Sequence, residues 1–481
     1  MIACRSWLLL VFGLLLPLVS PASSILVTDA NELSDALEHA RGGDVIRLKD
    51  GNWQDTQIAI DHGGEAGNPV EIRAETPGKV ILGGSSLLVL NAPYVTVDGL
   101  FFCKGSMKTS PVKAGSVKSW AVIWFNSNHD IVRNTAVVDY NPDSFSTRYY
   151  WAGFNGDDNL VDHCYFKGKN HTEPVIGNNF GARHNSVTFS YFKDIPFAEP
   201  NGREIIRVWG YGRNGELGDD GAFFNVESNL FEHADGEGME IVSLKGNRNT
   251  VRNNTVLASR GCLNIRQGSF NTIEGNIILC QDVPKAYGIR VSGANNVVRH
   301  NFISHGERGL VIMCGDYAGK DLTGQYEPSS GGAGENAGAA KYLPVKNLTL
   351  LDNVVVDSSL FDLAIGDVYK IHWPKSQMIL VPEDCLIASN RLVHSKGGTS
   401  VIGAVPETDP PLDQFTFQPN RYEGNVLVGG RDKFAPSVDG FTTVAIPGNW
   451  SEEKEREPFK PLTPADVGPD WAGAENLFSA F

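Results

Sequence analysis

The chain has 481 residues, and 41% of them are hydrophobic, so it is long enough to bury a large hydrophobic core. Its formal net charge of −15 at pH 7 argues against a protein that binds nucleic acid. The same charge does not exclude an anionic substrate, because binding depends on the local field of a site rather than on the total charge.

The N-terminal residues have the pattern of a secretory signal peptide. Arg5 supplies a positive charge, an apolar run extends from Trp7 to Val19, and small residues follow it. The run contains Pro17 and is too short to cross a hydrocarbon core of about 30 Å. We therefore expect residues 1–24 to be a cleaved signal peptide, and the mature protein to be secreted or periplasmic, without a membrane partner.

One helix is predicted, at residues 28–43. Asp29 and Glu32 form a capping-box pattern at its start, and Gly42 ends it. Between them lies one apolar stripe, made of Leu33, Ala36, Leu37 and Ala40. Since the rest of the chain is β-like, we expect this helix to cap the open edge of the first β unit.

A repeat of 22 to 25 residues follows the helix. Its unit has an Asn between two short apolar segments, as in "NTVRNNTV", "NTIEGNII", "NVVRHNFI" and "NLTLLDNVVV". The repeated position is occupied by Asn254, Asn276, Asn301 and Asn353, with weaker copies at Asn134, Cys164, Ser190, Asn229, Asn390 and Asn425. Short strands at this spacing predict an all-β, single-domain, right-handed parallel β-helix over residues 25–481. The stacked Asn side chains should form a hydrogen-bonded ladder.

Two segments depart from the repeat. Residues 315–342, rich in Gly and Ala, are predicted to be an inserted loop, and residues 439–481, rich in Pro and charge, a surface tail that wraps the last coils. Apart from Cys4, the six cysteines are scattered without a CxxC pair, which favours buried free thiols over a zinc site.

The repeat also predicts where charged residues lie. Lys245, Arg266 and Arg290 precede the Asn of their coils by 9, 10 and 11 residues, so they should stack on neighbouring strands about 4.8 Å apart. An ordinary solvated basic stripe is one interpretation. The other is a site in which Glu237 and Glu240, a bound polyanion, or both, offset the column of positive charge.

Three segments carry a family resemblance. "NGREIIRVWG" (201–210), "DGEGMEIVSLK" (235–245) and "GCLNIRQG" (261–268) resemble, in order, three motif blocks of the chondroitinase B and alginate lyase family, polysaccharide lyase family 6. The likeness extends almost from end to end of the mature chain, and it implies the same parallel β-helix.

The resemblance also implies roles. Lys245 matches the family's catalytic base, and Arg266, 21 residues later, its catalytic arginine. Asn201, Glu237 and Glu240 match positions where many members hold Ca²⁺. Glu237 is displaced by one residue from the usual pattern, so a calcium-independent enzyme is the alternative. The expected substrate-binding residues are Arg207, Arg290, Lys169, His171 and Gln267, the last at a position that is commonly His.

The resemblance implies β-elimination: removal of the C5 proton of a uronate and loss of the 4-linked sugar. The expected partner is an anionic polysaccharide, with alginate rich in mannuronate favoured over dermatan sulfate, and the enzyme is expected to be a monomer. A glycoside hydrolase that uses the paired Asp residues of "NGDDN" (155–159) or "GDDG" (218–221) is less favoured, because such loops are typical of turns. A β-helix that binds polysaccharide without cleaving it is a further alternative.

Overall fold

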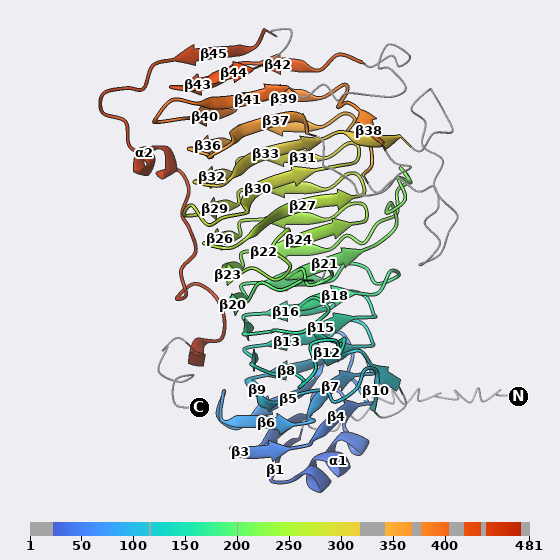
Figure 1. The fold of residues 1–481 in the computed structure, drawn as a ribbon. Coiled ribbons are helices and arrows are strands. Elements are labelled where there is room, and N and C mark those ends of the chain that lie inside the picture. The colour runs from blue at the N-terminus through green and yellow to red at the C-terminus, as the bar shows by residue number, and fades with distance from the viewer. Residues whose placement is uncertain are drawn as a thin grey trace, which may run out of the picture.

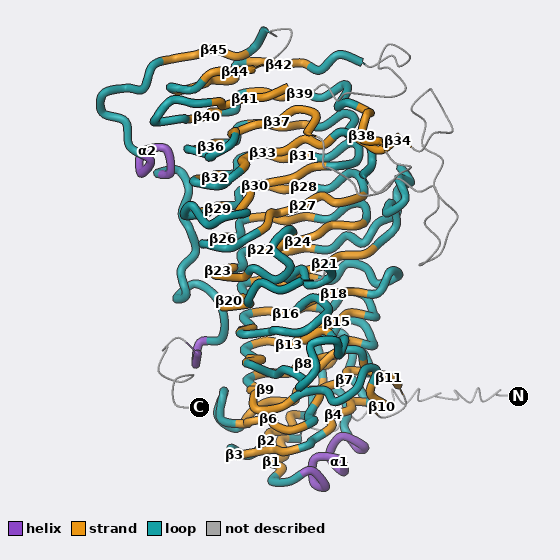
Figure 2. The backbone as a smooth tube through the Cα atoms, viewed as in Figure 1, coloured by secondary structure: helices purple, strands orange, loops and turns teal. Residues whose placement is uncertain are grey.

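The protein is an elongated stack of β coils. The computed structural model describes residues 23–114, 117–199, 201–317, 342–367, 377–403, 418–433 and 439–472. Each full coil contributes one strand to each of three parallel sheets, A, B and C (Figures 1 and 2). The predicted all-β parallel β-helix is therefore confirmed. Residues 1–22 of the predicted signal peptide and residues 318–341 of the predicted inserted loop lie outside the described residues.

Sheet A has 14 described strands. They are β1 (Ser24–Val27), β2 (Val45–Leu48), β5 (Val70–Ala74), β8 (Val95–Asp98), β13 (Ile131–Arg133), β16 (Leu160–Asp162), β19 (Ser186–Thr188), β22 (Asn225–Glu227), β25 (Thr250–Arg252), β28 (Thr272–Glu274), β31 (Val297–Arg299), β35 (Thr349–Leu351), β39 (Leu386–Ala388) and β42 (Arg421–Glu423).

Sheet B follows sheet A in each coil. Its described strands are β3 (Gly51–Gln54), β6 (Val80–Gly84), β9 (Leu100–Gly105), β14 (Ala136–Val138), β17 (Tyr165–Lys167), β20 (Tyr191–Ile195), β23 (Leu230–Ala234), β26 (Thr255–Leu257), β29 (Ile277–Leu279), β32 (Phe302–Ser304), β36 (Val354–Val356), β40 (Arg391–Val393), β43 (Asn425–Val428) and β45 (Phe441–Val444).

Sheet C completes the coil. Its described strands are β4 (Gln57–Ile60), β7 (Leu87–Leu90), β12 (Ala121–Phe125), β15 (Tyr150–Phe154), β18 (Ile176–Asn178), β21 (Ile206–Trp209), β24 (Glu240–Lys245), β27 (Gly261–Gln267), β30 (Ala286–Val291), β33 (Arg308–Met313), β37 (Phe361–Asp367), β41 (Thr399–Gly403) and β44 (Arg431–Lys433). Two antiparallel pairs lie outside the stack: β10 (Val112–Ala114) with β11 (Val117–Ser119), and β34 (Gly315–Tyr317) with β38 (Gln377–Leu380).

Helix α1 (Ala30–His39) lies at the N-terminal end of the stack, where it contacts β1, β2 and β4 (Figure 1). The Asp29 carboxylate accepts hydrogen bonds from the backbone N–H of Asn31 and Glu32, and the Glu32 carboxylate accepts one from that of Thr28 at 2.7 Å. Leu33, Ala36 and Leu37 are buried. The predicted capping box and buried stripe are confirmed.

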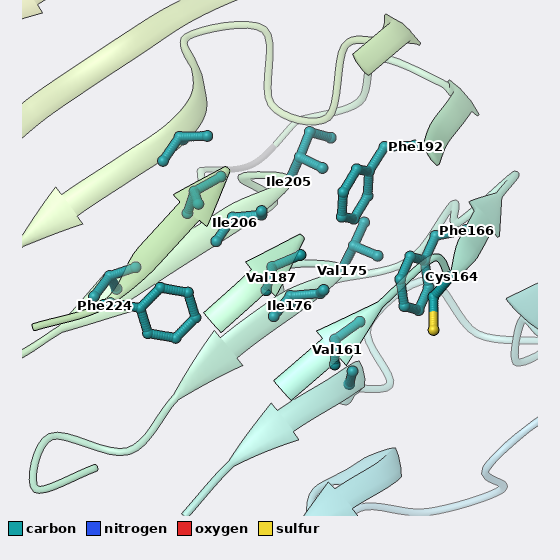
Figure 3. Packing of buried hydrophobic residues seen from close by; sticks show 14 of the residues in the cluster. Val161, Cys164, Phe166, Val175, Ile176, Val187, Phe192, Ile205, Ile206 and Phe224 are labelled. Atoms are coloured by element: carbon teal, nitrogen blue, oxygen red, sulfur yellow. The ribbon is translucent and has the colours of Figure 1, made fainter. Parts of the chain in front are cut away.

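The core is filled by side chains at equivalent positions of successive coils. Phe166, Phe192 and Phe231 form such a column, with ring centroids 5.2 and 4.9 Å apart. Figure 3 shows the first two of these rings, Phe166 and Phe192. Burying one such side chain contributes about 1.5–3 kcal/mol, so in-register stacking is strongly favoured. The six cysteines that the structure describes are buried and free, as predicted. No helix among the described residues is long and apolar enough to cross a membrane.

The predicted Asn ladder is present between sheets A and B. The backbone N–H of Asn254 donates to Asn276 Oδ1 at 3.0 Å, and the same bond links each consecutive pair from Asn229 through Asn425. Ser190 and Cys164 continue it. Asn134 does not: Thr135 occupies the ladder position, because Asn134 is the left-handed turn residue before it, at φ 47°.

A second ladder lies between sheets C and A. It contains Asn249, Asn271 and Asn296 in later coils, and Asp130, Asn159 and Asn185 in earlier ones. Asp130 is fully buried, and its Oδ2 has no hydrogen-bond partner among the described residues. Burial raises the pKa of this carboxyl to about 8, against the lowering effect of the N–H of Val95.

The C-terminal segment runs back along the outside of sheet B, past α2 (Glu452–Arg456), to the 3-10 turn η2 (Asp470–Ala472) (Figure 1). Leu462 N–H donates to Thr255, Gly468 N–H to Phe189, and Trp471 Nε1 to the carbonyl of Asn134. The tail contacts late coils through the pair of Arg391 and Glu455, as predicted, and it also extends beyond them to the early coils, whose outer face is apolar.

The substitution Asp130→Asn should stabilise the protein above about pH 5. In the unfolded chain this carboxyl titrates near 3.9. Since the folded pKa is the higher one, the folded state binds more protons between these values, and the wild-type free energy of unfolding falls as pH rises through that window. We expect Asp130→Asn to raise the free energy of unfolding by about 1–3 kcal/mol at pH 8 and to leave it unchanged at pH 4, as measured by urea unfolding. Asp35→Asn, at an exposed position of α1, is the matched control; an equal gain at both pH values would contradict the prediction.

Candidate active site

Lys245 and Arg266 lie on adjacent strands of sheet C. Leu244 of β24 aligns with Ile265 of β27, but Lys245 aligns with Gln267, so Arg266 is the extra residue of a β-bulge. A bulge re-aims the side chains beside it, and it accounts for the one-residue slip in the predicted spacing. The side chains of Lys245 and Arg266 are 13% and 17% exposed, so both are partly accessible at the outer face.

Three buried glutamates lie beneath these two cations. Glu204, Glu237 and Glu240 each offer a carboxylate oxygen within 4.8 Å of the others. Lys245 Nζ is 2.7 Å from Glu204 Oε1, and Arg266 Nε is 3.7 Å from Glu240 Oε1. The amine and the guanidinium are therefore held over one acidic cluster.

A tight turn directs Glu237 into the cluster. Its neighbours Gly236 and Gly238 have φ of 54° and 73°, and a Cβ on Gly236 would lie 2.3 Å from the carbonyl oxygen of Arg203. The N–H groups of Gly202 and Arg203 donate to Glu237 Oε2. The turn thus compensates for the one-residue displacement of Glu237 in the sequence motif.

The pKa values of Glu237 and Glu240 are shifted in opposite directions. Burial, and then Glu204 and Glu240, raise the pKa of Glu237. Burial also opposes ionisation of Glu240, but Lys245, Arg290 and Arg266 outweigh it and lower the pKa of that carboxyl. The ionised form of Glu237 is therefore disfavoured in the cluster, and a cation bound beside it would stabilise that form.

The donor set fits a hard divalent cation. Three carboxylates in one buried site provide the all-oxygen coordination that Ca²⁺ prefers. Glu237 and Glu240 were predicted as ligands, whereas Glu204 was not, although it lies three residues after Asn201 in the same motif. Asn201 itself is exposed at the start of this loop.

Arg290 and Arg207 flank the cluster. Arg290, on β30, is 2.6 Å from Glu240 and donates to Asn264 Oδ1. Arg207, on β21, is 2.5 Å from Glu173 and 3.4 Å from Glu204. Both lie on the outer side of sheet C beside the candidate catalytic pair, with side chains 8% and 10% exposed. Gln267 ends β27 beside Lys245 and is partly exposed.

Lys169 and His171 do not lie where they could contact a substrate. Their side chains are buried, with relative exposures of 1% and 0%. Lys169 Nζ donates to the carbonyl oxygens of His171, Thr172 and Glu173. Burial, with Lys169 beside it, lowers the pKa of His171 to about 2. The prediction that these residues bind substrate is therefore corrected: Lys169 organises the backbone of its own loop.

The side chain of Arg203 supports the same region. Its guanidinium donates to the carbonyl oxygens of Lys169, His171, Pro196, Ala198 and Gly236, which belong to three loops. Sequence reasoning missed two residues: Trp209, which lies beside Lys245, and Arg213, which lies over the ring of Trp209. The signal for Trp209 was available, since alternation along β21 places it on the same face as Arg207.

The paired aspartates lie on the surface and make contacts of their own. Asp220 pairs with Arg183 at 2.7 Å, and Asp219 with Arg248 at 2.7 Å. Asp157 accepts a hydrogen bond from the N–H of Arg183 in a turn. These contacts account for the Asp pairs as turn residues and give no support to the hydrolase alternative.

The chain is similar to known polysaccharide lyases over most of its length. A family model described as chondroitinase B matches residues 27–309. A family 6 polysaccharide lyase, Pedsa3628 from Pseudopedobacter saltans, has 37% sequence identity and a TM-score of 0.78, covering 93% of this chain and 99% of its own. A mannuronic acid-specific family 6 lyase from human gut microbiota has 24% identity and a TM-score of 0.73, covering 95% and 99%.

The alginate lyase AlyGC has 22% identity and a TM-score of 0.74, covering 93% of this chain and 59% of its own. No curated protein sequence matches the chain. The first of these structures, together with the family model, confirms the resemblance expected from the motifs, and the two less similar structures confirm the fold.

The substitution Lys169→Met should reduce stability, because it removes a buried donor that hydrogen-bonds to three carbonyl oxygens of the same loop. We expect a loss of about 2–4 kcal/mol in the free energy of unfolding, measured by urea titration. Lys346→Met, which removes a partly exposed lysine paired with Glu383, is the control and should cost about 0–1 kcal/mol. Unchanged stability with a raised KM for substrate would restore the substrate-binding assignment.

Proposed function

Because the chain belongs to the chondroitinase B family of polysaccharide lyases, we propose that it cleaves a uronate polysaccharide by β-elimination with Lys245 as the base. The observation that carries this proposal is the placement of Lys245 and Arg266 on adjacent strands, at the accessible face, over one cluster of buried carboxylates.

The reaction follows from these groups. Lys245 Nζ, in its neutral form, takes the proton from C5 of the uronate. The electron pair left on C5 forms the C4=C5 double bond as the C4–O4 bond breaks, and O4 takes up a proton through water beside Arg266. Arg266 and Arg290 stabilise the negative charge that develops on the uronate carboxylate. Glu204, 2.7 Å from Lys245 Nζ, orients the amine and pairs with the ammonium that forms.

Glu204, Glu237 and Glu240, with Asn201 as a further candidate ligand, are the residues that would hold Ca²⁺. When bound, such an ion neutralises the carboxylate next to C5 and so makes the C5 proton more acidic.

Alginate rich in mannuronate is the proposed substrate. Support comes from two similar structures, a mannuronic acid-specific lyase and an alginate lyase. Further support comes from the charges: Lys245, Arg207 and Arg290 are each already paired with a buried carboxylate, which leaves few cations for sulfate groups. Dermatan sulfate, the alternative, is favoured only by the description of the family model. The N-terminal sequence supports the further proposal that the enzyme acts after export.

Polymannuronate, polyguluronate and dermatan sulfate should be digested in parallel, and the ultraviolet absorbance of the new conjugated double bond followed. We expect product fastest from polymannuronate. Lys245→Ala and Arg266→Ala should each lower kcat by at least about 1,000-fold, because each removes a group that acts in the transition state. Arg299→Ala, on sheet A, should retain wild-type activity. Cleavage without the absorbance would indicate hydrolysis, and wild-type rates from Lys245→Ala would exclude it as the base.

Adding Ca²⁺ to chelator-treated protein should raise the melting temperature in a concentration-dependent manner, because a ligand that binds only the folded state stabilises it by mass action. Glu237→Gln and Glu204→Gln should each weaken that shift, and differential scanning calorimetry measures it without reference to activity. No shift in the wild type, combined with full activity in chelator, would show that this enzyme works without calcium.

A further inference from the structure

A Trp–Arg pair lies next to the catalytic lysine and has no part in the elimination step. Trp209 ends β21, and its Cα aligns with that of Lys245 on β24. Lys245 Nζ lies 4.8 Å from the centroid of the Trp209 ring, and Arg213 Cζ lies 4.2 Å from the same centroid. The aromatic ring therefore holds the Arg213 guanidinium close to the reacting site.

Arg213 differs from its cationic neighbours in its partners. Lys245 is paired with Glu204, Arg207 with Glu173, and Arg290 with Glu240. Within the described part of the chain, Arg213 has no carboxylate within ion-pair distance. Burial, and then the charges of Arg207 and Arg266, lower the pKa of Arg213. A half-buried guanidinium close to other cations is stabilised by an anion from outside the chain.

The loop that carries Arg213 is anchored to the strand that carries Lys245. Asn247, two residues after Lys245, donates its N–H to the carbonyl of Tyr211 at 2.7 Å and its Nδ2 to that of Glu216 at 2.8 Å. Gly212, at φ 92°, packs so closely that a Cβ would lie 1.8 Å from Asn247 Oδ1. The guanidinium is thus fixed before substrate arrives, which lowers the entropic cost of binding.

We propose that Arg213, held on Trp209, binds the carboxylate of a uronate adjacent to the one that Lys245 deprotonates. The proposal rests on the lyase function above. Arg266 and Arg290 serve the reacting ring from β27 and β30, whereas Arg213 approaches from the loop beyond β21, on the other side of Lys245. An anion at Arg213 therefore belongs to the neighbouring ring. This residue selects polymers in which consecutive rings are uronates over polymers in which uronates alternate with uncharged sugars.

The kinetic test uses polymannuronate with Arg213→Met, Arg213→Gln and Arg213→Lys. We expect the two neutral variants to raise KM about tenfold or more, because they lose a preorganised charge pair, and to keep kcat within about twofold. Arg213→Lys should retain most of the affinity. Arg299→Met is the matched control, since Arg299 is an arginine of sheet A paired with Glu274. Thermal unfolding of each variant separates lost binding from lost folding.

The binding test uses the Lys245→Ala background, which does not turn over, and isothermal titration calorimetry. The probes are tetramannuronate and the same oligomer with its carboxylates reduced to alcohols. Arg213→Met should weaken binding of the charged tetramer by about tenfold and leave binding of the reduced one unchanged.

Unchanged KM and unchanged binding in folded Arg213→Met would overturn the inference. A fall in kcat alone would also overturn it, because the residue would then act on the reacting ring. The two proposals fail separately: absence of unsaturated product from the wild type would refute the lyase function, whereas the calorimetric comparison decides the role of Arg213.

Discussion

The constraint on which this molecule depends is the stacking of parallel coils in register. Each coil buries its apolar side chains only by aligning them with those of the next, and the Asn ladders fix the alignment at the turns, where the sheets interrupt their hydrogen bonding. Because the register is maintained along the stack, residues 21 positions apart, such as Lys245 and Arg266, become neighbours on adjacent strands. The scaffold is rigid before any substrate is present, which is what a reaction that stabilises a developing charge requires.

At the site itself, the second constraint is the balance of buried charge. Glu204, Glu237 and Glu240 are too close to one another to be ionised without nearby cations, and the chain supplies Lys245, Arg266 and Arg290 around them. The same arrangement gives these cations fixed positions and directs them toward the face where a polyanion is expected. Arg203 acts one layer deeper, because it holds the turn that carries Glu237, and Lys169 holds its own loop, which carries the Glu173 partner of Arg207. Both side chains donate hydrogen bonds to backbone carbonyls, so their contribution is to the geometry of the site.

Much of the fold could be predicted from the sequence, because each coil of a solenoid repeats the same pattern of residues at a nearly constant spacing. The ladder residues from Asn229 onward, the capping helix and the adjacency of Lys245 and Arg266 all follow from spacing. The failures have local causes. Asn134 was predicted to occupy the ladder position, which belongs to Thr135, the next residue. The two positions are easily confused because Asn is common both at the left-handed turn position and at the ladder position that follows it. Lys169 was predicted to bind substrate because a sequence does not tell whether the amine of a lysine after a turn faces solvent or the carbonyl oxygens of its own loop. Glu204 and Arg213 belong to irregular loops, where no period predicts position.

The course of the C-terminal segment has a consequence for the molecule as a whole. In a simple solenoid each coil touches only its neighbours, so the stack can lose its end coils one at a time. Here residues 439–472 form a lengthwise tether, continuous with the last strand of sheet B and fastened to coils that contain Thr255, Phe189 and Asn134. Fraying of the C-terminal coils must also release that tether from the early ones. The structure therefore favours concerted melting over coil-by-coil unzipping.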